Sequence, residues 1–118
     1  MGQGDKERME YDYKIMDTEK MIEKVLSEKN VLQESLECLS MNLQHGFREL
    51  IYLNEELMRK GDDLAQVRQG ELEEKNQLMN QLFYNSKGDL EDICRKECYR
   101  LENVLDQLHQ EKEAIPWD

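Results

Sequence analysis

The feature that most constrains this chain is a seven-residue repeat of aliphatic side chains between Ile15 and Val67. If Ile15 takes position a of the repeat, twelve of the sixteen successive a and d positions hold Ile, Leu or Val. The a positions are Ile15, Ile22, Lys29, Leu36, Leu43, Leu50, Leu57 and Leu64, and the d positions are Thr18, Val25, Leu32, Leu39, Gly46, Leu53, Lys60 and Val67. Eight repeats in one register indicate an α-helix whose apolar stripe is covered by another helix, as in a coiled coil.

The composition supports a long helix and argues against a compact domain. Of the 118 residues, 38% are hydrophobic and 36% are charged, whereas compact domains carry about 45–50% apolar and about 25% charged residues. One proline and six glycines provide little turn chemistry for a β-fold. A disordered chain would not keep its aliphatic residues in register, so we expect an all-α, long-helix coiled coil.

The residues that interrupt the repeat bear on the number of strands. Lys29 and Lys60 occupy an a and a d position, where a lysine stem can lie along a two-stranded seam while its amine reaches solvent. The β-branched residues Ile15 and Ile22 at position a also favour two strands. We therefore expect a homodimer, with Gly46 at position d as a soft point in the seam.

Local signals divide the chain into segments. We expect a flexible lead over residues 1–9, a coiled-coil helix over 10–84 with a register change near 68–72, a break at 85–89, a second helix over 89–113 and a tail over 114–118. Asn85 and Gly88 can end a helix and Asp89 can cap the next one. Gly46 and Gly61 are interpreted as weak points within the long helix, although a turn at either remains an alternative.

Two architectures satisfy these segments, a single rod or a hairpin or bundle in which the C-terminal helix folds back. A second set of apolar side chains lies outside the a and d positions, and comprises Phe47, Ile51, Tyr52, Met58, Phe83 and Tyr84. This set is either the wide face of a helical bundle or a docking surface for another protein. We list it as the candidate partner-binding set.

The sequence holds no pattern that predicts a catalytic, cofactor or metal site. His45 and His109 lie far apart in sequence, and Cys94 and Cys98 have no second pair of ligands, as a zinc site would require. Three cysteines without a secretory leader are typical of reduced intracellular thiols. We expect no enzyme activity and no cofactor.

Charge and hydropathy narrow the partners further. The net charge is −11 and no segment is basic, which argues against binding to nucleic acid or to anionic membranes. No apolar run is long enough to insert into a membrane. We expect a cytoplasmic protein, with the cytoskeleton as one candidate location.

These observations predict a non-catalytic coiled-coil segment of a larger adaptor, tether or cytoskeleton-associated scaffold that binds itself and at least one other protein. The candidate self-association residues are Ile22, Val25, Leu32, Leu36, Leu39, Leu43, Leu50, Leu53, Leu57 and Leu64. The alternative is a self-contained helical bundle that acts as an effector domain and binds a globular partner such as a small GTPase.

Overall fold

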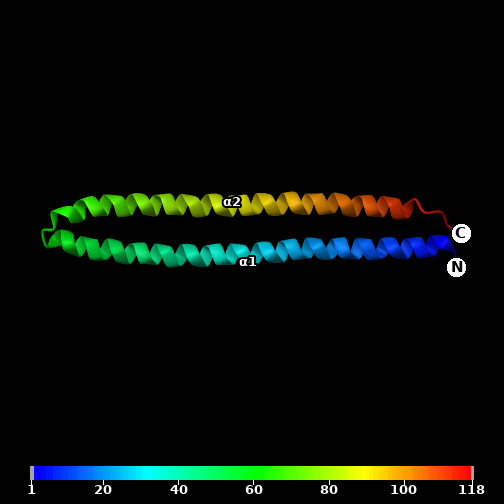
Figure 1. Cartoon of the computed structure of the whole chain (residues 1–118), viewed down its shortest axis with the longest axis horizontal. Coiled ribbons are helices and arrows are strands. Elements are labelled where there is room, and N and C mark those ends of the chain that lie inside the picture. The colour runs from blue at the N-terminus through cyan, green and yellow to red at the C-terminus, as the bar shows by residue number, and fades with distance from the viewer. Residues whose placement is uncertain (1, 118) are drawn as a thin grey trace. The chain divides into compact units, whose positions relative to one another are not determined.

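The structure, a computed structural model, describes residues 2–117, which form two long α-helices. Helix α1 spans Gln3–Arg59 and helix α2 spans Asp63–Glu113 (Figure 1). No strand occurs among the described residues. The prediction of an all-α chain built from long helices is therefore confirmed. Within residues 2–117, neither helix contains a stretch apolar enough and long enough to cross a membrane.

The connection between the two helices is a short turn centred on Gly61, whose backbone φ of 88° lies in the left-handed region. The amide of Gly61 donates to the carbonyl of Met58 and the amide of Asp62 donates to the carbonyl of Leu57, both at 3.1 Å. These two bonds close α1 in the way that a glycine past a helix end allows. Asp62 then caps α2, because its Oδ1 accepts a hydrogen bond of 3.0 Å from the amide of Leu64.

The expected helix over 10–84 is wrong, because the chain turns at Gly61 between α1 and α2. The break expected at 85–89 is also wrong, because α2 continues through these residues. Gly88 keeps a negative φ there, since Gly61 is the one positive-φ position among the described residues. A glycine inside a helix costs about 1 kcal/mol. A continuous helix offsets this cost through apolar burial, because it keeps Phe83 and Leu90, seven residues apart, on one half-buried row.

The expected flexible lead is also wrong in part, because α1 begins at Gln3. The carboxylate of Asp5 lies in the first turn, where negative charge stabilises a helix, and it pairs with Arg8 at 2.7 Å. Helix α2 ends at Glu113, and beyond it Ile115 is buried.

The chain divides into two compact units, which are described separately. The terminal unit comprises Met1–Val31 with Leu90–Asp118, and the turn unit comprises Leu32–Asp89. In each unit a segment of α1 packs beside a segment of α2 that runs in the opposite direction.

The terminal unit packs the a and d positions of α1 against α2. Ile15 and Thr18 are each 7% exposed, and Ile22 and Val25 are half-buried. The buried apolar residues contributed from the other part of the unit are Cys94, Leu101 and Ile115. Thr18 satisfies its hydroxyl by donating to the carbonyl of Lys14 at 2.8 Å, so this polar d position is accommodated without a cross-helix partner. At the outer end of the unit, the Lys112 amine lies 2.5 Å from the Asp12 carboxylate.

The turn unit packs a different face of α1 against α2. Its cross-helix hydrogen bonds come from Gln44, which donates to Asn80 at 3.0 Å, and from Asn54, which donates to the carbonyl of Ala65 at 2.6 Å. Gln44 is at position b of the repeat and Asn54 is at position e, so these positions face α2. The α2 side chains on the matching half-buried row include Gln69, Leu72, Asn76, Met79 and Phe83.

Candidate interaction surface

The turn unit leaves the a and d positions of α1 largely uncovered. We call Leu32, Leu36, Leu39, Leu43, Leu50, Leu53 and Leu57 the leucine stripe. Leu36 is half-buried, and the other six are between 40% and 59% exposed. The stripe spans 26 consecutive residues of one helix, interrupted at one core position by Gly46. The turn unit therefore presents an aligned set of apolar side chains to solvent.

A buried asparagine bonds α1 to α2 in the rotation that exposes the stripe. Asn54 is 4% exposed and occupies position e. Its Nδ2 donates to the Ala65 carbonyl at 2.6 Å and to Gln69 Oε1 at 3.0 Å, and its Oδ1 accepts from Arg68 Nε at 3.4 Å. A buried amide is costly without such partners, so rotating α1 to bury the stripe would lose all three bonds.

The asparagine is connected to the turn through Arg68. The Arg68 guanidinium lies 2.7 Å from Oδ2 of Asp62, the residue that caps α2. The hydrogen bond from Arg68 lowers the pKa of the Asp62 carboxyl from its usual value. One network therefore joins the helix cap to the position-e face of α1.

A shallow groove of about 380 Å³ runs beside the stripe. Leu50, Leu53 and Leu57 line it from α1, and Leu72 lines it from α2. The α2 side also contributes a charged row, Arg68, Glu71 and Lys75. Continuing this row at helical spacing leads to Leu78 and Leu82, which are 56% and 66% exposed. The apolar surface is therefore wider than one helix toward residue 82.

The exposed border of the stripe holds few charged side chains, although the net charge of the chain is −11. The exposed flank, position g, holds Ser35, Asn42, Glu49 and Glu56 over this stretch. Glu49 lies 3.1 Å from Nε2 of His45, and Glu56 lies 3.2 Å from the Arg59 guanidinium. Glu56 therefore has a cationic neighbour on the same helix, whereas the His45 beside Glu49 adds positive charge only when it is protonated.

Seven of the ten predicted self-association residues belong to the leucine stripe. Of the other three, Ile22 and Val25 are half-buried in the terminal unit. Leu64 is 67% exposed but lies in the first turn of α2, past the reversal at Gly61. These three are therefore not members of the leucine stripe.

The predicted partner-binding residues separate into two groups. Phe47, Ile51 and Met58 are half-buried at positions e and b, the positions at which Asn54 and Gln44 bond to α2. They form part of the contact between the helices, so a partner at these side chains would compete with α2. Tyr52, at position c, is 60% exposed and lies outside that contact.

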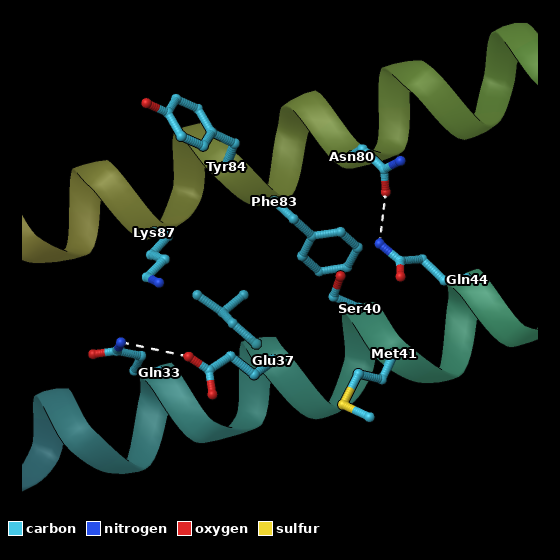
Figure 2. Close-up of a pocket in the computed structure, with 10 residues that line it drawn as sticks. Gln33, Glu37, Ser40, Met41, Gln44, Asn80, Phe83, Tyr84 and Lys87 are labelled. Atoms are coloured by element: carbon cyan, nitrogen blue, oxygen red, sulfur yellow. Dashed lines mark hydrogen bonds between the residues drawn. The ribbon is translucent and has the colours of Figure 1, made fainter.

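The other two predicted residues, Phe83 and Tyr84, line a groove of about 420 Å³. Figure 2 shows the Phe83 ring pointing between the helices toward Ser40, while the Tyr84 ring points away from α1. The groove is bordered by Met41 and by the hydrogen-bonded pair Gln44–Asn80. From α1 the groove is lined by residues at positions e, b and f, and also by Leu36 of the leucine stripe.

Asn54, Arg68 and Asp62 are the residues of this region that sequence reasoning missed. An asparagine at position e resembles any solvated flank residue in sequence. The available signal was the pair Gly61-Asp62, which has the chemistry of a helix end followed by a cap.

The cysteines and histidines form no cluster with ligand geometry. Cys94 is buried, Cys98 is half-buried one helical turn away, and Cys38 is exposed. Burial raises the pKa of the Cys98 thiol, and the neighbouring Cys94 raises it further. Within residues 2–117, no group of three or more His, Cys, Asp or Glu side chains could hold a metal ion.

Comparison of the chain with protein-family models, curated proteins and solved structures found no match in any of the three.

Proposed function

We propose that the chain is a non-catalytic helical segment that self-associates through the leucine stripe of its turn unit. The observation that carries the proposal is the exposure of six leucines, 40–59% each, in one register on one helix face. Contiguous exposed apolar patches on monomeric proteins are small, and larger ones mark interaction sites. A stripe at a and d positions is the surface that a second helix covers in a coiled coil.

A second copy of the chain is the occupant that the borders of the stripe favour. Two chains with a net charge of −11 repel each other at long range. Along the stripe, however, Glu56 is paired with Arg59, Glu49 lies beside His45, and the remaining flank residues Ser35 and Asn42 are uncharged. Glu49 is therefore the one carboxylate of this flank without a permanently cationic neighbour.

In this proposal the turn unit joins copies of the chain, and the rest of the helix surface is available to a second protein. That is the role of an adaptor, tether or scaffold. We propose that the chain has this role and that it acts in the cytoplasm. The effector-domain alternative differs in a measurable way, because it requires a monomer that binds its partner alone.

Sedimentation equilibrium of the full chain tests the proposal. The wild type is expected to self-associate, and Leu50→Asp combined with Leu57→Asp is expected to be monomeric, because two buried carboxylates per chain would face the second copy. Circular dichroism should show unchanged helix content, since both leucines are exposed in the single chain.

A matched control places the same two charges away from the stripe. Met41, at position f of α1, and Tyr84, on α2, are 70% and 79% exposed, and neither belongs to the leucine stripe. Met41→Asp with Tyr84→Asp should keep the oligomer. A monomeric wild type would overturn the proposal, and so would loss of the oligomer in this control with the stripe variant unaffected.

A further inference from the structure

Gly46 is the one position of the stripe that lacks a side chain, and the fold does not require a glycine there. A Cβ atom built on Gly46 would meet nothing within 4 Å. Its backbone is helical, without the positive φ of Gly61. A glycine inside a helix costs about 1 kcal/mol relative to alanine, and the single chain shows no packing that offsets this cost. Gly70 and Gly88 are equally open, but they lie on α2 and interrupt no apolar stripe.

We propose that two copies of the leucine stripe pair antiparallel, with Leu43 of each copy packed into the space beside Gly46 of the other. This inference rests on the proposed self-association and specifies its orientation. It commits the surface to one occupant, the same stripe of a second copy.

The register of the repeat supports this pairing. In an antiparallel pair of helices, core layers join an a position to a d position. If the two-fold axis of the pair passes between Gln44 and His45, every a residue of the stripe lies opposite a d residue of the other copy. The layers are Leu32 with Leu57, Leu36 with Leu53, Leu39 with Leu50, and Leu43 with Gly46, each occurring twice. The stripe is therefore complementary to itself.

Side-chain volume distinguishes the two orientations. In a parallel pair, position d meets position d, so Gly46 would face Gly46 and one core layer would contain no side chain. In the antiparallel pair each Gly46 lies opposite Leu43 of the other copy. The missing side-chain volume is therefore divided between two layers, and each layer contains one leucine. Close packing of large against small side chains avoids a cavity, and cavities of leucine size destabilise proteins by several kcal/mol.

The flanking residues are compatible with the antiparallel pair. Position g faces position g in this orientation, which places Asn42 against Glu49 and Ser35 against Glu56. Each glutamate thus meets an uncharged hydrogen-bonding side chain instead of another glutamate. Lys29 and Lys60, at the ends of the stripe, meet lysines in either orientation and do not distinguish them.

Filling the space at position 46 tests the inference, because the two orientations predict opposite changes in the dissociation constant. In an antiparallel pair, Gly46→Leu places a leucine against Leu43 of the other copy, and this overpacking should weaken self-association at least about tenfold. In a parallel pair the same change fills the empty layer and should tighten self-association. Sedimentation equilibrium gives the dissociation constants.

The exchange variant, Leu43→Gly with Gly46→Leu, is the control. It restores one leucine and one glycine per layer in the antiparallel pair, so its dissociation constant should return to within about threefold of wild type. This recovery shows that the single variant fails through packing between the copies and not through damage to the helix. If Gly46→Leu tightens the oligomer, the antiparallel inference is wrong.

Spin labels provide an independent reading of orientation, after Cys38→Ser, Cys94→Ala and Cys98→Ser remove the native thiols. In the antiparallel pair, labels at Ser35→Cys should be about 30 Å apart along the axis, and labels at Asn42→Cys about 10 Å apart. A parallel pair would give equal, short distances at both positions and would overturn this inference alone. A wild type that stays monomeric would overturn the proposed function as well.

Discussion

The same seven-residue repeat of α1 is used differently in the two units. In the terminal unit its a and d residues, such as Ile15 and Thr18, are buried against α2. In the turn unit the e and b residues face α2, and the a and d leucines remain exposed. A heptad pattern therefore specifies a stripe that a helix can cover, but it does not specify which helix covers it at each point along the stripe.

Helix geometry explains why the covered face changes. With 3.6 residues per turn, a strict seven-residue stripe rotates by about 20° per repeat around a straight helix. About four repeats separate the middle of the terminal unit's α1 segment from that of the turn unit's, which gives roughly 80°. The rotation carries the α2-facing side from a and d toward e and b, the change that the buried residues of α1 show.

Truncating one aliphatic residue in each unit should give the largest difference in stability between the two units. Ile15→Ala removes a side chain that is 7% exposed and should lower the free energy of unfolding by about 2–5 kcal/mol. Leu53→Ala removes one that is 59% exposed and should change the stability of the single chain by less than about 1 kcal/mol. Urea unfolding at a concentration where the chain is monomeric measures both.

The same two variants should exchange rank when self-association is measured. Leu53→Ala should raise the dissociation constant, whereas Ile15→Ala should affect it only through loss of folding. Equal losses of stability for the two variants would show that the d positions of the turn unit are covered within the single chain, contrary to the exposure of Leu53.

The sequence was sufficient to predict helix type because the aliphatic repeat extends over most of α1. It placed the break at 85–89 and not at Gly61, because Gly61-Asp62 and Asn85 to Asp89 have similar turn chemistry. The difference lies in tertiary packing, since a turn at 85–89 would divide the half-buried α2 row that includes Phe83 and Leu90. Such a row becomes visible only once its partner helix is known.

Removing the buried amide of Asn54 should have the next largest effect. Asn54→Ala loses bonds to the Ala65 carbonyl and to Gln69 and Arg68, and should destabilise the turn unit by about 1–3 kcal/mol. Asn80→Ala is the control, because it removes one exposed cross-helix bond and should cost less than about 1 kcal/mol. Hydrogen exchange of turn-unit amides reports the local loss.

The outcome for Asn54 also bears on which face of α1 meets α2. Asn54→Leu removes the polar network but keeps a side chain of similar size. If this variant were more stable and its stripe were more protected from hydrogen exchange or side-chain labelling, the polar network would be the feature that keeps the stripe exposed. If Asn54→Ala cost no more than Asn80→Ala, the network would not determine the rotation of α1.

The candidate site was predictable in its residues but not in its exposure. The leucine stripe follows from the repeat alone, and seven of its members were expected to mediate self-association. Phe47, Ile51 and Met58 could not be assigned in the same way, because an apolar e or b residue is equally compatible with a partner protein and with a second helix of the same chain. The bonds of Gln44 and Asn54 to α2 identify the second helix.

The turn should be sensitive to a substitution that α2 tolerates. Gly61→Ala forces a side chain into a φ of 88° and should cost about 1–2 kcal/mol. Gly70→Ala adds a methyl group at a helical position with nothing within 4 Å and should stabilise the chain by about 0.5–1 kcal/mol. Thermal unfolding of both variants measures the difference, and stabilisation by Gly61→Ala would contradict the left-handed turn.

The smallest expected effect is in the terminal unit, where Arg8 contacts the C-terminal tail. Its guanidinium lies 3.7 Å from the centre of the Trp117 ring and donates to the Pro116 carbonyl at 3.3 Å. A cation over an exposed aromatic ring contributes about 0.5–1 kcal/mol, so Arg8→Ala should lower stability by about that amount.

Amide exchange should locate this small loss in the terminal unit and leave the turn unit unchanged. Arg95→Ala is the matched control, because Arg95 pairs with Asp92 on its own exposed helix face and the variant should cost about 0.3 kcal/mol. Arg8→Lys tests the geometry of the contact, since an amine keeps the charge but cannot both stack on the ring and reach the carbonyl as a planar guanidinium does. Full stability in Arg8→Lys would mean that charge alone holds the tail. A loss close to that of Arg8→Ala would mean that the tail of the terminal unit is held by the planar geometry of the guanidinium. Such a contact would contrast with the exposed apolar stripe of the turn unit.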